Sequence, residues 1–281
     1  MKKWPFYGWI GILLILIFWT VNWTMTGYRT NWAFFPLWAG YILTVDAIVF
    51  SIKGSSLLHR GMYRFLALFL VSVPCWWLFE LINSRARYWV YEGREHFSNV
   101  QYFILASIAF STVTPAMFET AELIFASGWI RRLGKGPVIH ARMPAMVSMF
   151  TLGWIMLGLV LCDPAHFPYF VWISVYFILE PLNIWLGFNS LIRYTARGDW
   201  RPVIALWTGS LICGFFWEMW NYLSYPKWLY HIPHFNSLHV FEMPLIGYLG
   251  YLPFSLELFA MYYFMCGILG VKGLLFINRD Q

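Results

Sequence analysis

Two segments decide the fold: Trp77-Leu78-Phe79-Glu80-Leu81-Ile82-Asn83 and, 138 positions later, Phe215-Phe216-Trp217-Glu218-Met219-Trp220-Asn221. Both are apolar, and in both an asparagine follows a glutamate by three residues, which places the two side chains on one face of a helix. The same spacing relates Cys75 to Cys213, Pro115 to Pro253 and Glu119 to Glu257. Carboxyl and amide groups are costly inside apolar helices. Their recurrence therefore predicts a duplicated helical protein with a paired polar site.

The composition predicts an integral membrane protein. Of the 281 residues, 60% are apolar and only 11% are charged, whereas a soluble domain carries about 25% charged residues. The net charge of +6 comes from basic residues that gather in alternate loops. That bias is typical of cytoplasmic segments, so we expect no nucleic-acid partner. The four cysteines lie in or beside apolar segments and have neither metal-site nor disulfide spacing.

Eight windows have the roughly 20 mostly apolar residues that a membrane-spanning helix needs. They are approximately 8–24, 34–52, 62–83, 103–127, 144–162, 169–189, 203–223 and 245–270. Because each half has an even number of spans, both halves enter the membrane from the same side. The sequence therefore predicts an all-α fold of two parallel four-helix repeats, 1–138 and 139–281, which form one structural unit.

The basic residues predict the orientation. With eight spans, 14 of the 19 lysines and arginines lie on the side of the two termini. Both termini are therefore predicted to be cytoplasmic, in an inner or plasma membrane. The two long connections, about 84–102 and 224–244, then face the other side. We expect them to fold back as caps over the bundle.

Four repeated carboxyl groups are the candidate acids. Glu80 and Glu218 lie near the outer ends of their spans, while Glu119 and Glu257 lie deeper, each four residues after a proline. No lysine or arginine is expected at the depth of these four or of the other acids in the spans, Asp46, Glu122 and Glu180. A carboxyl without such a partner keeps its proton in an apolar site, because burial disfavours the charged form. A neutral carboxylic acid among aromatic rings can donate a proton and so start carbocation chemistry.

The same residues allow a structural interpretation. A glutamate and an asparagine on one helix face can simply hydrogen-bond a neighbouring helix. In the functional interpretation Asn83 and Asn221 orient the acids. Aromatic residues, which make up 22% of the chain, form the binding pocket, and the candidates are Trp77, Trp217, Trp220, Trp228 and Tyr230. Such rings can stabilise a cation or line a pocket for a flat apolar ligand, although packing and interfacial belts also use them.

No metal and no cofactor is expected. All seven histidines lie in connections or at span ends, and no Gly-rich phosphate loop, Ser-His-Asp arrangement or CxxC motif occurs. One group has the residue types of a zinc site: His231-x-x-His234 with His239 and Glu242 nearby. Its spacing is loose and the first half has no matching set.

The second-half pattern also has a family resemblance. It consists of Trp217-Glu218, Asn221, Trp228-x-Tyr230, and Gly247-x-x-Gly250-x-x-Pro253 followed by Glu257. This pattern resembles the membrane lycopene cyclase domain of carotenoid biosynthesis, which occurs as two related halves, fused or separate. A single glutamate, four residues after the proline, stands here where that family has an adjacent acidic pair. The resemblance implies that buried carboxyl groups protonate an isoprenoid.

Two classes of function follow. The first is cofactor-free, acid-catalysed cyclisation, isomerisation or hydration of a membrane-dissolved isoprenoid or carotenoid. The alternative is a non-enzymatic membrane protein, either a transporter of a small lipophile or a structural subunit of a membrane assembly. We expect membrane lipid and a hydrophobic small-molecule substrate as partners, and the sequence leaves the oligomeric state open.

Overall fold

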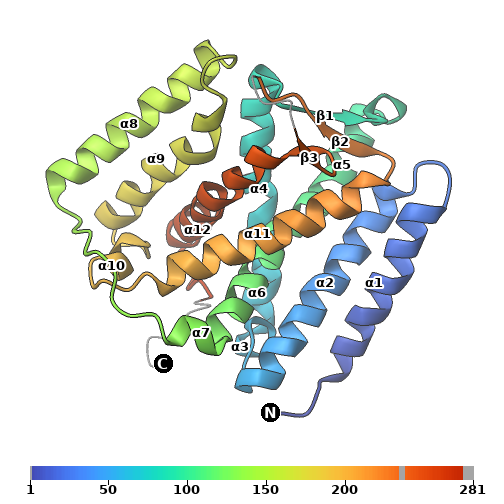
Figure 1. The fold of residues 1–281 in the computed structure, drawn as a ribbon, viewed down its shortest axis with the longest axis horizontal. Coiled ribbons are helices and arrows are strands. Elements are labelled where there is room, and N and C mark those ends of the chain that lie inside the picture. The colour runs from blue at the N-terminus through green and yellow to red at the C-terminus, as the bar shows by residue number, and fades with distance from the viewer. Residues whose placement is uncertain (1, 234–237, 275–281) are drawn as a thin grey trace.

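The computed structural model describes residues 2–233 and 238–274, most of which are helical (Figure 1). The helices of the first half are α1 (Phe6–Thr24), α2 (Thr30–Lys53), α3 (Leu57–Arg60), α4 (Met62–Ala86), α5 (Asn99–Phe110), α6 (Val113–Ala126) and α7 (Gly128–Arg131). Those of the second half are α8 (Met143–Cys162), α9 (Val171–Trp185), α10 (Ile192–Thr195), α11 (Arg201–Tyr222) and α12 (Tyr251–Ile268). Three 3₁₀ turns are η1 (Arg94–His96), η2 (Pro168–Phe170) and η3 (Leu245–Gly250), and four short strands are β1 (Trp89–Glu92), β2 (Lys227–Tyr230), β3 (His239–Val240) and β4 (Met243–Pro244).

Seven helical segments of the described chain are long and apolar enough to cross a membrane, rather than the eight expected. They are α1, α2, α4, α5 with α6, α8, α11, and η3 with α12. The window 169–189 forms α9, whose 15 residues are fewer than the roughly 20 that a span needs. A 3₁₀ turn that begins at Pro168 precedes α9, and Gly187, with φ of 78°, follows its end.

The outer surface of the bundle is apolar. In Figure 1, α1 and α8 lie on opposite sides of the molecule. Leu13 and Leu16 are exposed on α1, as are Trp154 and Ile155 on α8. Large exposed apolar surfaces are unfavourable in water and suit contact with lipid. This surface and the seven long apolar helices suggest an integral membrane protein.

Small residues bring the helices together. A Cβ atom on Gly11 would lie 2.8 Å from the Gly40 carbonyl oxygen, so α1 and α2 are in close backbone contact. In the second half, a Cβ atom on Gly153 of α8 would lie 2.9 Å from the Ser174 carbonyl oxygen on α9. Glycine permits such close approach between apolar helices, where packing stabilises the pair.

The predicted helix 103–127 is two helices, because α-helical hydrogen bonding is interrupted at Ser111 and Thr112, although both residues keep right-handed helical dihedrals. The Ser72 hydroxyl on α4 bridges the break: it donates to the Phe110 carbonyl oxygen at 2.6 Å and accepts from the Thr114 backbone nitrogen at 3.0 Å. These bonds satisfy backbone groups that the interruption would leave without partners.

One acid has basic partners, contrary to expectation. The fully buried Glu122 carboxylate accepts hydrogen bonds from Arg60 at 2.6 Å and from Lys53 at 2.9 Å. The expectation that no cation reaches the depth of the acids is therefore wrong for Glu122. It failed because Lys53 ends α2 and Arg60 ends α3, and their long side chains reach inward from those ends.

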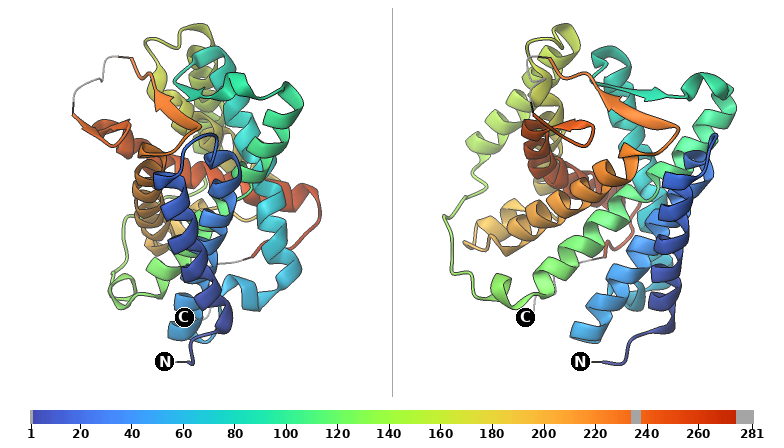
Figure 2. Two further views of the ribbon diagram at one scale, coloured as in Figure 1. Left: turned by 90° about the vertical axis from the view of Figure 1, so that its right-hand side faces the viewer. Right: turned by 45° about the vertical axis from the view of Figure 1, so that its right-hand side comes forward.

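The two long connections contribute β1 and β2, which pair as an antiparallel ribbon. The cross-strand partners are Trp89 and Tyr230, Val90 and Leu229, Tyr91 and Trp228, and Glu92 and Lys227. The ribbon lies at the end of the bundle opposite α3 and α7 (Figures 1 and 2). It joins segments that are almost 140 residues apart in the sequence.

Candidate functional site

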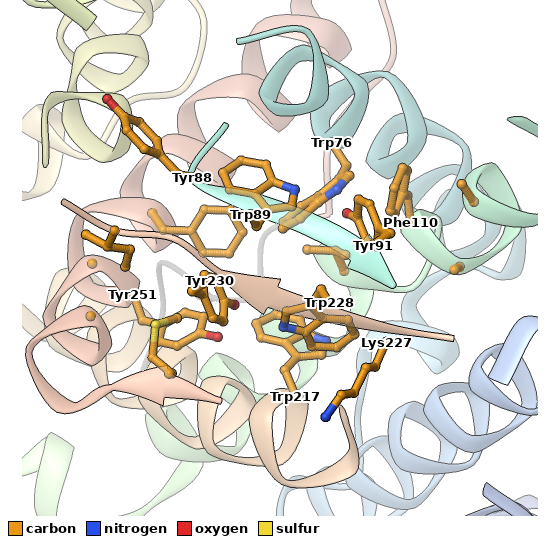
Figure 3. Close-up of a pocket in the computed structure, with 18 of the residues that line it drawn as sticks. Trp76, Tyr88, Trp89, Tyr91, Phe110, Trp217, Lys227, Trp228, Tyr230 and Tyr251 are labelled. Carbon is orange, nitrogen blue, oxygen red and sulfur yellow. The ribbon is translucent and has the colours of Figure 1, made fainter. Parts of the chain in front are cut away.

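One face of the β1–β2 ribbon is aromatic. Because side chains alternate along a strand, Trp89, Tyr91, Trp228 and Tyr230 share a face, whereas Val90, 42% exposed, lies on the other. These four rings line a cavity of about 540 Å³ (Figure 3). Ligand pockets typically enclose about 300–1,000 Å³, so this cavity has the size of a small-molecule site.

One carboxyl oxygen of Glu80, on α4, accepts hydrogen bonds from three aromatic side chains. Its Oε1 accepts from the Tyr91 hydroxyl at 2.6 Å, from Trp76 Nε1 at 2.9 Å and from Trp89 Nε1 at 3.0 Å. All three donors line the cavity. The glutamate therefore lies behind the aromatic wall and fixes the positions of its rings.

Glu218 of α11 has the corresponding position in the second half. Its Oε1 accepts from the Tyr251 hydroxyl at 2.7 Å and the Tyr230 hydroxyl at 2.8 Å. Glu218 is fully buried, and its Oε2 has no hydrogen-bond partner among the described residues. A carboxyl oxygen that is buried without a partner is unusual, and it leaves this group free to hold a proton.

The two strand tyrosines are permanent donors at neutral pH. Burial, together with the neighbouring Glu80 carboxyl, raises the pKa of Tyr91 well above its ordinary value. Burial and the Glu218 carboxyl do the same to the pKa of Tyr230. Both hydroxyls therefore stay protonated and donate to their glutamates.

Asn83 and Asn221 hold the ribbon by its main chain. Asn83 Nδ2 donates to the Trp89 carbonyl oxygen at 2.8 Å, and its Oδ1 accepts from the Tyr88 backbone nitrogen at 2.8 Å. Asn221 Nδ2 donates to the Trp228 carbonyl oxygen at 2.7 Å, and its Oδ1 accepts from the Trp228 nitrogen at 3.0 Å. Each asparagine therefore attaches a strand to the helix that also carries the glutamate.

The two halves thus make the same set of contacts. In each, a helix presents a glutamate and, three residues later, an asparagine. The asparagine binds the backbone of the tryptophan in a Trp-x-Tyr strand, and the glutamate accepts from the tyrosine of that strand. The two strands then pair with each other, and the ribbon they form is one wall of the cavity.

Further aromatic rings complete the wall. Trp172 of α9 stacks on Trp89 with ring centroids 5.8 Å apart, and Trp217 of α11 stacks on Tyr251 at 6.0 Å. In Figure 3, Trp217 lies near Trp228 of β2, whereas Trp76 and Phe110 lie near β1. The wall therefore draws on both halves and consists mainly of flat π surfaces.

The candidate pocket residues divide into two groups. Trp217, Trp228 and Tyr230 line the cavity. Trp77 instead stacks on Phe103 at 5.0 Å, and Trp220 is buried against Trp38 at 4.9 Å. Neither Trp77 nor Trp220 is among the described residues that line the cavity, and both pack helices together.

The deeper acids lie apart from the cavity wall. Glu257 of α12 is fully buried, and its Oε1 accepts from the Val175 backbone nitrogen at 3.2 Å. Glu119 of α6 is also fully buried, and its carboxyl lies beside that of Asp46. The equal spacing predicted that Glu119 and Glu257 are equivalent and belong to one site with Glu80 and Glu218, but each contacts a different helix, and neither is among the described residues that line this cavity.

Several wall residues were not identified from the sequence. Tyr91 had a signal, because the alternation in Trp-x-Tyr indicates a strand with both rings on one face. Trp76 also had a signal, because it precedes Glu80 by four residues. Trp172, Tyr251 and Arg94 line the cavity without any local pattern that distinguishes them from other aromatic or loop residues.

Within 2–233 and 238–274, no group of three or more His, Cys, Asp and Glu residues could hold a metal ion. His234 of the zinc-like group lies outside the described residues. Glu242 binds Lys227 in an ion pair of 2.5 Å.

No protein-family model, no curated protein and no solved structure matches this chain. The function must therefore be inferred from the cavity and its hydrogen bonds.

Proposed function

We propose that this is an integral membrane enzyme, built from two parallel four-helix repeats, that rearranges a membrane-dissolved isoprenoid or carotenoid by acid catalysis without a cofactor. One observation carries the proposal. Glu80 and Glu218, which occupy corresponding positions in the two halves, each accept a hydrogen bond from a tyrosine that lines a single aromatic cavity. The likeness of the second-half motif to membrane lycopene cyclases adds support.

The hydrogen bonds suggest how a proton moves. In the ground state Tyr230 and Tyr251 donate to Glu218. For catalysis, one of these hydroxyls turns from the carboxyl toward the cavity and gives its proton to a substrate double bond, while its oxygen takes the proton of a protonated Glu218. The resulting carbocation is stabilised by the faces of Trp217 and Trp228. Loss of a proton from the cation to the same tyrosine–glutamate pair yields a cyclised or isomerised product, whereas addition of water yields a hydrated one. Neither outcome needs an oxidant or a reductant.

The remaining predicted residues have supporting roles in this proposal. Asn83 and Asn221 position the strands, and Glu119 and Glu257 stabilise helix contacts. Seven spans alone would put the two termini on opposite sides, so this proposal also requires α9, which packs against α8, to return the chain across the membrane. Both termini are then cytoplasmic, and the cavity is closer to the opposite face of the membrane. Trp77 and Trp220 act through packing.

The test compares lipids that co-purify with the wild type, with Glu80→Gln and with Glu218→Gln, using mass spectrometry and absorption spectra. The exposed Glu95 provides the matched control, Glu95→Gln. We expect the wild type to carry a stoichiometric isoprenoid. Conversion of that isoprenoid, added back to each purified protein and followed by mass spectrometry, should be about 100-fold or more slower in the two cavity variants, the usual contribution of a general acid. The control should retain full turnover.

Other outcomes favour the alternative functions. An isoprenoid that all four proteins bind and leave chemically unchanged would favour a transporter of a small lipophile. Ordinary phospholipid alone, in equal amounts in all four, would favour a structural subunit of a membrane assembly. Either result would contradict the enzymatic proposal.

A further inference from the structure

The two charged residues among those that line the cavity both lie at one end of it. They are Arg94 and Lys227. Lys227 pairs with Glu92 at one end of the ribbon, and Arg94 follows Glu92 by two residues, whereas Trp89 and Tyr230 pair at the other end. Figure 3 shows Lys227 at the far end of the ribbon from Tyr251. At about 3.3 Å per residue, the two ends of the ribbon are about 10 Å apart.

Arg94 is fixed in place but not neutralised. Its guanidinium donates to the Asn99 Oδ1 at 2.6 Å and to the Phe97 carbonyl oxygen at 2.7 Å, and it lies 4.1 Å from the centroid of the Tyr102 ring. No carboxylate in the described part of the chain forms an ion pair with it. Lys227, in contrast, is paired with Glu242. The uncompensated positive charge at this end therefore belongs to Arg94.

A polar side chain without a partner lies at the same end. Asn31, in the first turn of α2, lines the cavity, and its buried Oδ1 has no hydrogen-bond donor among the described residues. The neighbouring Thr30 hydroxyl accepts from the Tyr225 backbone nitrogen at 2.8 Å, which ties the start of α2 to the chain that enters β2. A buried acceptor without a donor is unfavourable, and a ligand that donates a hydrogen bond there would satisfy it.

The opposite end of the cavity is apolar. Trp172 of α9 lies there, because its ring stacks on Trp89 at that end of the ribbon with centroids 5.8 Å apart, and neither of the two charged lining residues lies at that end. A ligand that fills both ends must therefore combine a charged group with a hydrocarbon chain.

We propose that the ligand is a phosphorylated isoprenoid, whose phosphate binds Arg94 and whose chain lies along the aromatic face of the ribbon. A phosphate monoester accepts from the forked guanidinium of Arg94 and, when singly protonated, donates to Asn31 Oδ1. Lys227 adds a second cation beside the headgroup. This inference rests on the proposed function, since it names the headgroup of the isoprenoid that the cavity would bind.

The experiment measures binding of two probes to the purified protein in detergent by quenching of tryptophan fluorescence. One probe is a prenyl monophosphate and the other is the prenyl alcohol of the same chain length. We expect the wild type to bind the phosphate at least tenfold more tightly than the alcohol. Arg94→Gln should remove this preference while leaving alcohol binding unchanged, and Arg94→Lys should retain part of it. Arg85→Gln, an exposed arginine at the end of α4, is the matched control and should behave as the wild type does.

The contrary results distinguish a failure of the headgroup inference from a failure of the proposed function. Two results would overturn the headgroup inference without contradicting the proposal that the cavity binds an isoprenoid. One is equal affinity of the wild type for the two probes, and the other is that Arg94→Gln loses binding of the alcohol as well as of the phosphate. Failure of both probes to bind would instead contradict the proposed function. Two competitors identify the source of the anion: displacement of the prenyl phosphate by inorganic phosphate alone, or equally by phosphatidylglycerol, would refute an isoprenoid phosphate as the ligand.

Discussion

Trp89 lies directly opposite Tyr230 in the β1–β2 ribbon, and each donates a hydrogen bond to the glutamate of its own half. The next pair on that face, Tyr91 and Trp228, reverses the residue types. The two carboxyl groups are therefore linked through neighbouring rings and a shared set of main-chain hydrogen bonds. A change at one half of the site should consequently be felt at the other.

This linkage predicts coupling between Asn83 and Asn221. Either asparagine, changed to alanine, leaves backbone groups of a strand without partners, and we expect a loss of about 1–3 kcal/mol of stability. Because the strands pair, the double variant should deviate from additivity by at least about 0.5 kcal/mol. Unfolding in detergent measures the three free energies. Asn83→Ala combined with the change of exposed Tyr63 to Phe is the control pair, and equal additivity in both pairs would exclude the coupling.

The strand tyrosines predict a loss of stability at high pH. The folded state keeps the protons of Tyr91 and Tyr230 above the ordinary tyrosine pKa of about 10, whereas the unfolded chain releases them. The stabilising contribution is present below about pH 10 and is lost as the pH rises through the higher folded pKa values. Unfolding free energies between about pH 8 and pH 11 should fall less steeply in the double variant Tyr91→Phe, Tyr230→Phe. An unchanged slope would contradict this assignment, and Tyr63→Phe serves as the control.

The buried ion pairs of Glu122 predict that Glu122→Gln strongly destabilises the protein. Glu122→Gln keeps the shape of the side chain but leaves Lys53 and Arg60 facing each other without an anion. Removal of one member of a buried ion pair typically destabilises a protein by about 3–5 kcal/mol. Thermal unfolding should show this loss, whereas Glu95→Gln at the surface should stay within about 0.5 kcal/mol of the wild type.

Two glycines on α8 provide a matched test of close helix packing. A Cβ atom on Gly153 would lie within 2.9 Å of backbone atoms of α9, whereas a Cβ atom on Gly158 meets nothing within 4 Å. Gly153→Ala should therefore destabilise the protein by about 1–3 kcal/mol through overpacking. Gly158→Ala should instead stabilise it slightly, because alanine is a better helix former than glycine. Equal effects would show that α8 does not depend on this contact.

The helical fold was largely accessible from the sequence because long apolar windows are strong signals. Seven of the eight windows correspond to helices of spanning length. The window 169–189 was misjudged because hydropathy does not register where a helix begins: Pro168 and the turn that follows it shorten α9. The break at Ser111 had a signal in the sequence, because Pro115 has no N–H to donate to the Ser111 carbonyl oxygen. The hydrogen bonds from Ser72 of α4 that bridge the break were not predictable, since Ser72 is distant in the sequence.

The candidate site was partly accessible. The 138-residue register identified Glu80, Asn83, Glu218 and Asn221, whose contacts with the ribbon recur in both halves. Register alone could not show that Glu119 and Glu257 lie away from the cavity wall, because equivalent positions need not share a cavity. Arg94 and Trp172 were missed because their proximity to the wall arises only when separate segments pack together.

The asparagine contacts have a consequence for how this protein could diversify. Asn83 and Asn221 bind carbonyl and amide groups, which every residue type except proline provides in full. These main-chain contacts therefore do not depend on which rings the ribbon displays at 89, 91, 228 and 230. The side chains of Trp89, Tyr91 and Tyr230 add hydrogen bonds to the two glutamates. Substitutions that keep a donor for Glu80 and for Glu218 would reshape the cavity while its frame stayed in place, so new ligand preferences could evolve without a new fold.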